Sequence, residues 1–389
     1  MEIIREPNSQ VVKLVALFEI GRLEESKKGL AQSVSSMMKK STKYKNNEEL
    51  QIALDRYGIN IEINSSPLYL SAEMHCHKKF FKQSIPLFFE ILFESKFDEH
   101  IWEIVRSQTI ESILQNQNQT DFWADKLLSE HIFGANHPLG YYSEPKDYLS
   151  ITLTDIEDFY SKYIQITKPS FFIAGDVDEN VETDIIQALE IYPLETSPIN
   201  KSIKFNLSTP QVLTKTLAET NQASISLGKI FPRDSFDNFM QLELFSTFLG
   251  GYFTSELMRL LRIELGYTYG VYSYLIHFPK FSFFQITYET DASNVEASLD
   301  AINNLFNRLN STEKIDFKES RMQYFSQWSK NAERSLQEIM YKIRLKRLGY
   351  DYRDYKSIVE NYSGEIALDL NHYTSAFLDF SSYSKSIVS

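Results

Sequence analysis

The sequence predicts an α+β protein made of two similar domains, each a mostly antiparallel sheet covered by helices on one face. Three observations lead to this prediction. A chain of 389 residues is long enough for two domains of roughly 100–200 residues each. Short segments that alternate in hydrophobicity stand beside longer ones with helical spacing. The order strand, helix, helix, strands, helices occurs twice, on either side of a segment rich in Pro, Ser and Thr.

The segment rich in Pro, Ser and Thr spans residues 193–210 and is the expected linker. We therefore assign residues 1–195 to an N-terminal domain and residues 196–389 to a C-terminal domain. The two halves share this plan without clear residue-by-residue identity, so the repeat is architectural.

In the N-terminal domain, Gly58 follows the second helix at a position where a left-handed residue commonly ends a helix. Ile59, Ile61 and Ile63 then fall on one face, as a half-buried strand requires. The expected elements are strands at 10–19, 58–65, 68–76 and 171–174, and helices at 27–40, 47–57, 78–93, 98–115, 122–132, from 154 onward and at 181–191.

The C-terminal domain repeats the plan. Its expected elements are strands at 223–230, 268–276 and 280–288, helices at 236–249, 254–265 and 294–309, and mostly helix over 313–380.

Composition excludes several classes of function. The net charge of −12 argues against a nucleic-acid partner, which requires basic surfaces, and is compatible with basic peptide partners. The single cysteine, Cys76, excludes a disulfide framework. The polar, acidic start of the chain is unlike a signal peptide. The most apolar stretch, 85–93, is far shorter than the about 20 residues that a membrane span needs. We therefore expect a cytoplasmic protein with no membrane partner.

The first candidate functional segment, 29–42, is predicted as a helix. It reads Gly-Leu-Ala, then Gln-Ser-Val-Ser-Ser at 32–36, then Met-Met-Lys-Lys-Ser-Thr. Gln and Ser side chains are poor zinc donors, since zinc in proteins takes thiolate, imidazole or carboxylate.

The second candidate segment, 261–269, reads Leu-Arg-Ile-Glu-Leu-Gly-Tyr-Thr-Tyr. Arg262 is expected in the last turn of a helix that Gly266 ends, and Tyr269 early in the next strand, so that both side chains can point into one cleft. The spacing alone favours a structural role for both residues. An arginine in a last helical turn complements the helix dipole, and tyrosine favours strands.

In the order and spacing of its motifs, the chain resembles the insulinase-type zinc metallopeptidases, a pitrilysin-like, inverted-zincin family. The similar branch is the one whose chains of about this length pair as two subunits. Besides the two candidate segments, the resemblance rests on Asn-Glu-Glu-Leu at 47–50, Gly-Ile-Asn-Ile at 58–61, His-Pro-Leu-Gly at 137–140, Thr-Leu-Thr-Asp-Ile at 152–156, Ala-Gly-Asp-Val at 174–177 and Leu-Gly-Gly-Tyr-Phe-Thr-Ser-Glu-Leu at 249–257.

The resemblance implies a degenerate zinc site. The two ligand histidines of the family fall on Gln32 and Ser36, its general base falls on Ser35, and its third ligand falls on Glu111. One carboxylate cannot hold the ion, because a catalytic zinc needs three protein ligands. We therefore expect no metal, no cofactor and no peptidase activity in this chain alone, although Glu111 also fits an ordinary exposed helix carboxylate.

The resemblance also implies that Arg262 and Tyr269 bind substrate near the scissile bond. Ile263, between them, stands where the family often has an acidic residue. In the paired branch, the subunit without zinc keeps this pair of residues and presents it to its partner. The implied protein is a non-catalytic, substrate-binding subunit of a heterodimeric zinc metallopeptidase that acts on peptides or unfolded segments. The homologous zinc-bearing partner would supply the metal.

Two other interpretations stay open. The chain is alternatively a metal-free peptide-binding or structural scaffold with no peptidase partner, in which Arg262 and Tyr269 are remnants. An independent enzyme that uses other groups is the least supported, because no Ser/His/Asp, Cys/His or phosphate-binding arrangement stands out in the sequence.

Overall fold

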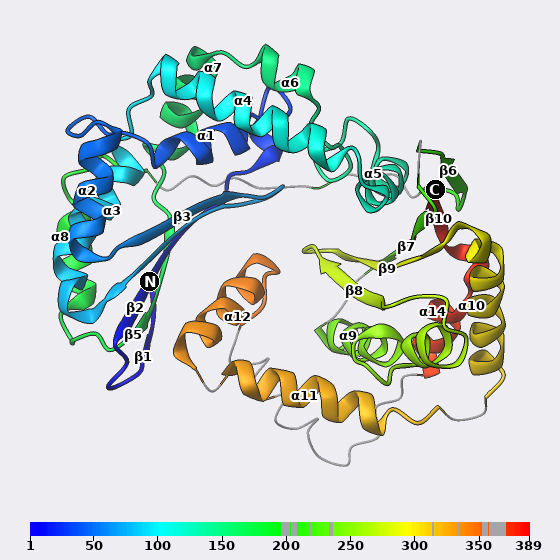
Figure 1. The fold of residues 1–389 in the computed structure, drawn as a ribbon. Coiled ribbons are helices and arrows are strands. Elements are labelled where there is room, and N and C mark those ends of the chain that lie inside the picture. Colours follow the sequence, from blue (N-terminus) through cyan, green and yellow to red (C-terminus); the bar gives the residue numbers. More distant parts are fainter. Residues whose placement is uncertain are drawn as a thin grey trace. The chain divides into compact units, whose positions relative to one another are not determined.

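The computed structural model describes residues 1–195, 203, 208–217, 220–232, 236–312, 315–332, 334–351, 357 and 371–389. The chain forms two compact units (Figure 1). The first comprises Met1–Gln115, Ser143–Lys204 and Glu333–Met340, and the second comprises Asn116–Tyr142, Phe205–Ala332 and Tyr341–Ser389. Residues 116–142 thus precede the predicted domain boundary and cluster with the second unit, and residues 333–340 follow it and cluster with the first.

The first unit is built on a five-stranded sheet whose strand order is β1-β5-β2-β4-β3. All neighbouring strands are antiparallel except β1 and β5, which are parallel. Ile61 and Ile63 point into the core while Glu62 between them is exposed, so the predicted alternation is confirmed. The strands are β1 (Glu2–Arg5), β2 (Val11–Phe18), β3 (Asn60–Ser65), β4 (Leu70–His77) and β5 (Ser170–Gly175).

Helices cover one face of this first sheet and bury a core rich in Phe, Ile and Leu (Figure 1). Gly58 ends the second helix with φ +59°, as predicted from its position. The helices are α1 (Leu30–Met38), α2 (Asn47–Tyr57), α3 (Phe81–Phe93), α4 (Glu99–Asn116), α6 (Pro145–Ser150), α7 (Leu153–Phe159) and α8 (Val181–Leu189).

The second unit repeats the plan with a sheet of order β6-β10-β7-β9-β8. Its parallel pair, β6 with β10, again lies at one edge, and the other neighbours are antiparallel. The prediction of two similar α+β domains with mostly antiparallel sheets is confirmed. The strands are β6 (Val212–Lys215), β7 (Gln222–Pro232), β8 (Val271–His277), β9 (Phe281–Asp291) and β10 (Ser384–Val388).

Alternation along β7 separates the two faces of the second sheet. Ala223, Ile225 and Leu227 join the core with α9 (Phe236–Gly250), α10 (Val295–Asn310) and α14 (Asn371–Leu378). The opposite face is polar where it carries Ser224 and Ser226 and aromatic where it carries Phe281 and Phe283, and α5 (Thr120–Phe133) packs against β7 and β10 there. Ser226, from that polar face, donates a hydrogen bond to Asp125 of α5 at 2.9 Å. This polar face holds the pocket described below.

Two further helices are α11 (Lys318–Ala332) and α12 (Ser335–Arg347). The start of α12 belongs to the first unit, where the Ser335 amide donates to a carboxylate oxygen of Glu6 at 3.1 Å and the Lys13 ammonium donates to the Met340 sulfur at 3.1 Å. In the described part of the chain, no helix combines the length and the apolar character that a membrane span requires.

Several elements differ from expectation. The strands β1, β6 and β10 were not predicted, and the helix expected at 254–265 is instead a π-helical segment, Met258–Glu264. The following strand begins at Val271 rather than at residue 268. Parts of the expected linker (196–202 and 204–207) and of the last helical region (313–314, 333, 352–356 and 358–370) lie outside the described residues.

Candidate functional site

The helix that the resemblance aligns with the zinc helix is α1, and its three substituted positions hold neutral side chains, each with a hydrogen-bond contact. The amide nitrogen of Gln32 lies 3.5 Å from the Ser36 hydroxyl, and the Ser65 hydroxyl on β3 donates to the Gln32 amide oxygen at 3.1 Å. The Ser35 side chain is buried and donates to the Gln32 backbone carbonyl at 2.8 Å. These hydrogen bonds occupy groups that are weak metal donors to begin with.

Glu111 lies on α4 with its side chain exposed, and it accepts a hydrogen bond from Gln115 on the same helix at 3.4 Å. Within the described residues, no group of three or more His, Cys, Asp or Glu side chains is placed to hold a metal ion. The donor set around α1 therefore does not fit the zinc of the family.

The start of α1 is held by a carboxylate from the preceding loop. Glu25 accepts hydrogen bonds from the Ala31 amide at 3.0 Å and the Gly29 amide at 3.4 Å. Burial raises the pKa of Glu25 to about 7, against the opposing effect of these amides. Gly29 has φ +88°, and a Cβ added there would lie 2.9 Å from the Tyr148 ring, so the Gly of the Gly-Leu-Ala frame is structurally required.

The Arg262 segment forms the corner between the π-helical segment and β8. Gly266, with φ +66°, ends the helical segment, and the Tyr267 amide donates to the Leu261 carbonyl at 2.8 Å as in a Schellman-type end. The Arg262 side chain is exposed, with its guanidinium 4.9 Å from the Phe253 ring centroid. Tyr269 is 90% exposed and precedes β8, so its expected position inside the strand is corrected: the turn after Gly266 takes up more residues than predicted.

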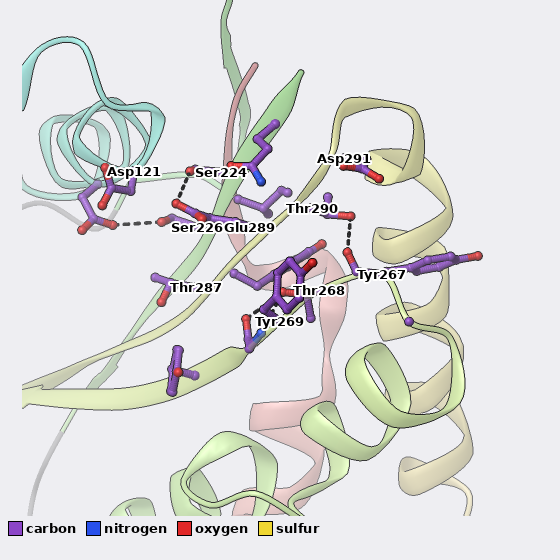
Figure 2. A pocket seen from close by; sticks show the side chains of 17 residues that line it. Asp121, Ser224, Ser226, Tyr267, Thr268, Tyr269, Thr287, Glu289, Thr290 and Asp291 are labelled. Carbon is purple, nitrogen blue, oxygen red and sulfur yellow. Dashed lines mark hydrogen bonds between the residues drawn. The ribbon is translucent and has the colours of Figure 1, made fainter. Parts of the chain in front are cut away.

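Tyr269 lines a pocket of about 680 Å³ on the polar face of the second sheet (Figure 2). Arg262 is not part of the lining, so the structure places only one of the two expected substrate-binding residues at this pocket. The lining is contributed by α5, β7, the corner before β8, β8 itself and β9. It comprises Asp121, Asp125, Gln222, Ser224, Ile225, Ser226, Gly266, Tyr267, Thr268, Tyr269, Gly270, Tyr272, Thr287, Tyr288, Glu289, Thr290 and Asp291.

Hydrogen bonds fix two carboxylates of the pocket. Asp125 accepts from Ser226 at 2.9 Å and from Gln285 at 2.6 Å (Figure 2 shows the Ser226 bond). Burial raises the pKa of Asp125, while these two bonds oppose the rise. Ser224 lies 3.5 Å from a carboxylate oxygen of Glu289. The strands β7, through Ser224 and Ser226, and β9, through Glu289, therefore present hydroxyl and acidic groups toward the pocket.

The acidic residues of this pocket escaped the sequence analysis, because no motif marks them. The available signal was alternation: Ser224 pairs with Glu289 and Ser226 with Thr287 in the strand register, so polar groups recur on one face of β7 and β9. No local pattern indicates that Asp121 and Asp125 of α5 face these strands.

Two family models match the chain. The one described as Insulinase (Peptidase family M16) matches residues 1–140, and the one described as Peptidase M16 inactive domain matches residues 150–337. The chain belongs to the M16 peptidase family. The family that the sequence motifs resemble is thereby confirmed.

This M16 chain is also similar to curated proteins. It is 23% identical over 254 residues to the non-peptidase homolog YmxG of Helicobacter pylori, a match that covers 64% of this chain and 58% of that protein. It is 23% identical over 251 residues to the uncharacterized zinc protease YmxG of Bacillus subtilis, covering 63% and 60%. Each match therefore spans less than two thirds of the relative's length.

Among solved structures, the M16 inactive domain protein from Pseudomonas fluorescens matches with a TM-score of 0.88. The match has 16% sequence identity and covers 99% of this chain and 94% of that one. At this identity the match shows that the two proteins share the M16 fold.

Proposed function

We propose that this M16 chain is the non-catalytic, substrate-binding subunit of a pair whose other member carries the zinc. The observation that carries the proposal is an asymmetry between the two candidate segments. The α1 positions hold Gln32, Ser35 and Ser36 in neutral hydrogen bonds, whereas Arg262 and Tyr269 stand exposed at the other segment. The name of the Helicobacter relative, a non-peptidase homolog, agrees with the first half of this asymmetry.

The catalytic groups that this chain lacks define what the partner would supply. Zinc lowers the pKa of a bound water from about 15.7 to about 7, and a carboxylate then accepts its proton. The side chains on α1 provide neither ligands for the zinc ion nor the carboxylate that would accept the proton. We therefore assign the metal, its ligands and the general base to a homologous zinc-bearing M16 subunit.

The remaining chemistry defines what this chain would supply. The Arg262 guanidinium and the Tyr269 phenol donate hydrogen bonds, which suit a peptide carbonyl or the oxyanion that develops during its hydrolysis. Both groups reach solvent, so a substrate can meet them without displacing core side chains. The proposed substrates are extended peptides or unfolded segments, and the proposed compartment is the cytoplasm.

The test is kinetic and uses the assembled pair. We expect Arg262→Ala or Tyr269→Phe to lower the turnover of the pair by about 10²-fold, the usual effect of removing one oxyanion donor. Assembly, followed by size-exclusion chromatography, should stay unchanged because both side chains are exposed. Arg308→Ala removes an equal charge elsewhere in the second unit and should leave turnover unaffected. Full turnover in both test variants would exclude the shared-site proposal.

The second candidate function is a metal-free scaffold or peptide-binding protein without a peptidase partner. The neutral bonding of Gln32 to both Ser36 and Ser65 favours it equally. Co-expression with zinc-bearing M16 chains of the same genome separates the two functions. A stable pair with activity supports the subunit, and the failure of every candidate to pair or gain activity supports the scaffold.

A further inference from the structure

The guanidinium of Arg262 contacts an aromatic ring and no carboxylate. Its central carbon lies 4.9 Å from the centroid of the Phe253 ring, a distance at which a cation is attracted to the negative face of the ring. Within the described part of the chain, this ring is the only group that the guanidinium contacts through a hydrogen bond, an ion pair or a ring interaction. The exposed Arg262 side chain therefore has one defined partner.

The arginine three residues earlier is held in a different way. Arg259 donates hydrogen bonds to a carboxylate oxygen of Glu256 at 3.3 Å and to the Thr254 carbonyl at 3.2 Å. Its donors are engaged and its charge is balanced by the ion pair with Glu256. Among the described residues, no carboxylate pairs with Arg262 in this way. The two arginines of one helical segment thus differ in what they can still bind.

The kind of contact decides how many donors an arginine keeps. The guanidinium is planar, and its five N–H donors form a fixed fork. A carboxylate beside it commonly takes two of these donors through parallel bonds, whereas a stacked ring covers the face of the group. The Phe253 ring can therefore hold the guanidinium in place and leave its N–H groups available for a peptide carbonyl or an oxyanion.

The backbone that carries Phe253 is anchored on both sides. Before it, the Gly251 amide donates to the Thr247 carbonyl at 3.0 Å, and a Cβ added at Gly251 would lie 2.6 Å from the Thr247 Cα. After it, the buried Ser255 donates its amide hydrogen to the Tyr252 carbonyl at 3.1 Å. The Phe253 side chain is 57% exposed, so an anchored turn presents the ring at the surface instead of placing it in the core.

We propose that Phe253 is a positioning residue for Arg262, whose guanidinium it orders before the substrate arrives. An exposed arginine loses conformational entropy when it binds, and a side chain that is already ordered loses less. The inference rests on the proposed function, which assigns substrate binding to Arg262. It goes further by naming the residue that controls the position of this arginine.

The first test measures the motion of Arg262 in the isolated chain, without partner or substrate. Nitrogen-15 relaxation of the arginine Nε–H groups reports how restricted each side chain is, and the signal that disappears in Arg262→Lys assigns the resonance. We expect this group to be more ordered than that of Arg56, an exposed arginine of α2 with no ring contact among the described residues. The Phe253 ring current should also shift its proton upfield.

Variants connect this order to the ring. Phe253→Leu keeps the apolar bulk and removes the ring, so Arg262 should become as mobile as Arg56 and lose the ring-current shift. Phe253→Tyr keeps the ring and should preserve both signals. Tyr44→Leu removes a ring of similar exposure, 62%, from the first unit and should change neither signal. Because Phe253 is exposed, circular dichroism should show both of its variants folded.

The second test is a double-mutant cycle on kcat/KM of the assembled pair. Phe253→Leu should lower kcat/KM about two- to fivefold, the factor that corresponds to a cation–π contact at an exposed site. In the Arg262→Ala background, the same substitution should have no further effect, because the ring then has no arginine to position. A ring that served only packing or assembly would cause the same loss in both backgrounds.

Three results would overturn the inference: an Arg262 side chain as mobile as Arg56 in the unaltered chain, an Arg262 that stays ordered in Phe253→Leu, or equal kinetic losses in the two backgrounds. The proposed function fails by a different result. If neither Arg262→Ala nor Tyr269→Phe changes turnover of the pair, the shared-site proposal is wrong, and the relaxation measurement on the isolated chain still decides whether Phe253 orders Arg262.

Discussion

At the scale of single residues, Gln32 and Ser36 illustrate how two side chains change the chemistry of a helix without disturbing it. Both remain on the same side of α1, one helical turn apart, and they contact each other at 3.5 Å. Gly29 and Glu25 still support the start of the helix. The helix therefore keeps its geometry, while its side chains offer an amide and a hydroxyl in place of zinc ligands.

We expect the purified chain to contain well below one zinc per molecule after exposure to excess zinc and desalting, measured by plasma mass spectrometry. The matched variant is Gln32→His with Ser36→His, which restores two imidazoles and tests Glu111 as the third ligand. This variant should gain zinc, and adding Glu111→Gln should remove it. One tightly held zinc in the unaltered chain would contradict the expectation.

At the scale of elements, an ionic cluster around the buried His277 joins α9, β8, β9 and α12 in the second unit. His277 lies 2.7 Å from a carboxylate oxygen of Glu243 and 2.6 Å from the Ser282 hydroxyl, and Arg344 pairs with the same Glu243 oxygen. Burial alone would raise the pKa of Glu243, but Arg344 and His277 outweigh it and lower the pKa to about 2.

The lowered pKa of Glu243 sets the sign of an acid dependence. Because the unfolded chain binds this proton near pH 4.5 and the folded chain near pH 2, the stabilisation is complete above about pH 4.5 and is lost as pH falls toward 2. Glu243→Gln should lower the free energy of unfolding by about 1–3 kcal/mol at pH 6 and flatten its decline between pH 5 and 3. Urea unfolding at each pH measures both, and an unchanged slope would contradict this role.

Two glycines allow a matched test of how α1 and the corner are built. Gly29 and Gly266 both have positive φ, at +88° and +66°, but only at Gly29 would a new Cβ meet a side chain, the Tyr148 ring at 2.9 Å. Gly266→Ala should cost about 1–2 kcal/mol from the left-handed backbone alone. Gly29→Ala should cost more because a clash adds to that strain. Equal urea midpoints for the two variants would show that the Tyr148 ring moves away from the new Cβ without a measurable loss of stability.

At the scale of the whole molecule, each half of the sequence gives a helical segment to the other half's unit. Residues 116–142, with α5, cluster with the second unit, and residues 333–340, at the start of α12, cluster with the first. On α5, the buried Ala124 and Leu128 belong to this packing. The units are therefore not the two consecutive pieces that a simple linker would produce.

Cutting the chain at the predicted boundary tests this exchange. Fragments 1–195 and 196–389 should each unfold at lower denaturant concentration than the intact chain, because each lacks a segment that completes its unit. When co-expressed, the two fragments should copurify, with an affinity tag on one fragment as the readout. Fragments that stay apart, each with a cooperative transition at the midpoint of the intact chain, would show that the exchanged segments contribute little.

The sequence was sufficient to predict an element where a local pattern of residues determines that element. Ile61 and Ile63 marked a half-buried strand, and Gly58 marked a helix end. The strand β10 was missed because buried Ser384 and Ser386 alternate with Lys385 and Ile387, which leaves no apolar face to detect. Its place between β6 and β7 depends on pairing with segments far away in the sequence.

The candidate site likewise has one part that the sequence predicts and one part that it does not. The motif around Arg262 and Tyr269 could be read locally, whereas the pocket could not. Asp121 and Asp125 reach it only because α5 packs across the polar face of the second sheet. That packing is a property of the tertiary fold and leaves no trace in the spacing of residues along the chain.

The position of β10 has a consequence for biosynthesis. Residues 384–388 occupy an interior place in the second sheet, with β6 on one side and β7 on the other. While the ribosome still encloses them, those two neighbours have no strand to join them, and the hydrogen-bonding edge of each is open to other chains. The first unit can begin to fold during translation, but the second sheet closes only after this late segment has emerged, which makes the nascent second unit a candidate client for chaperones.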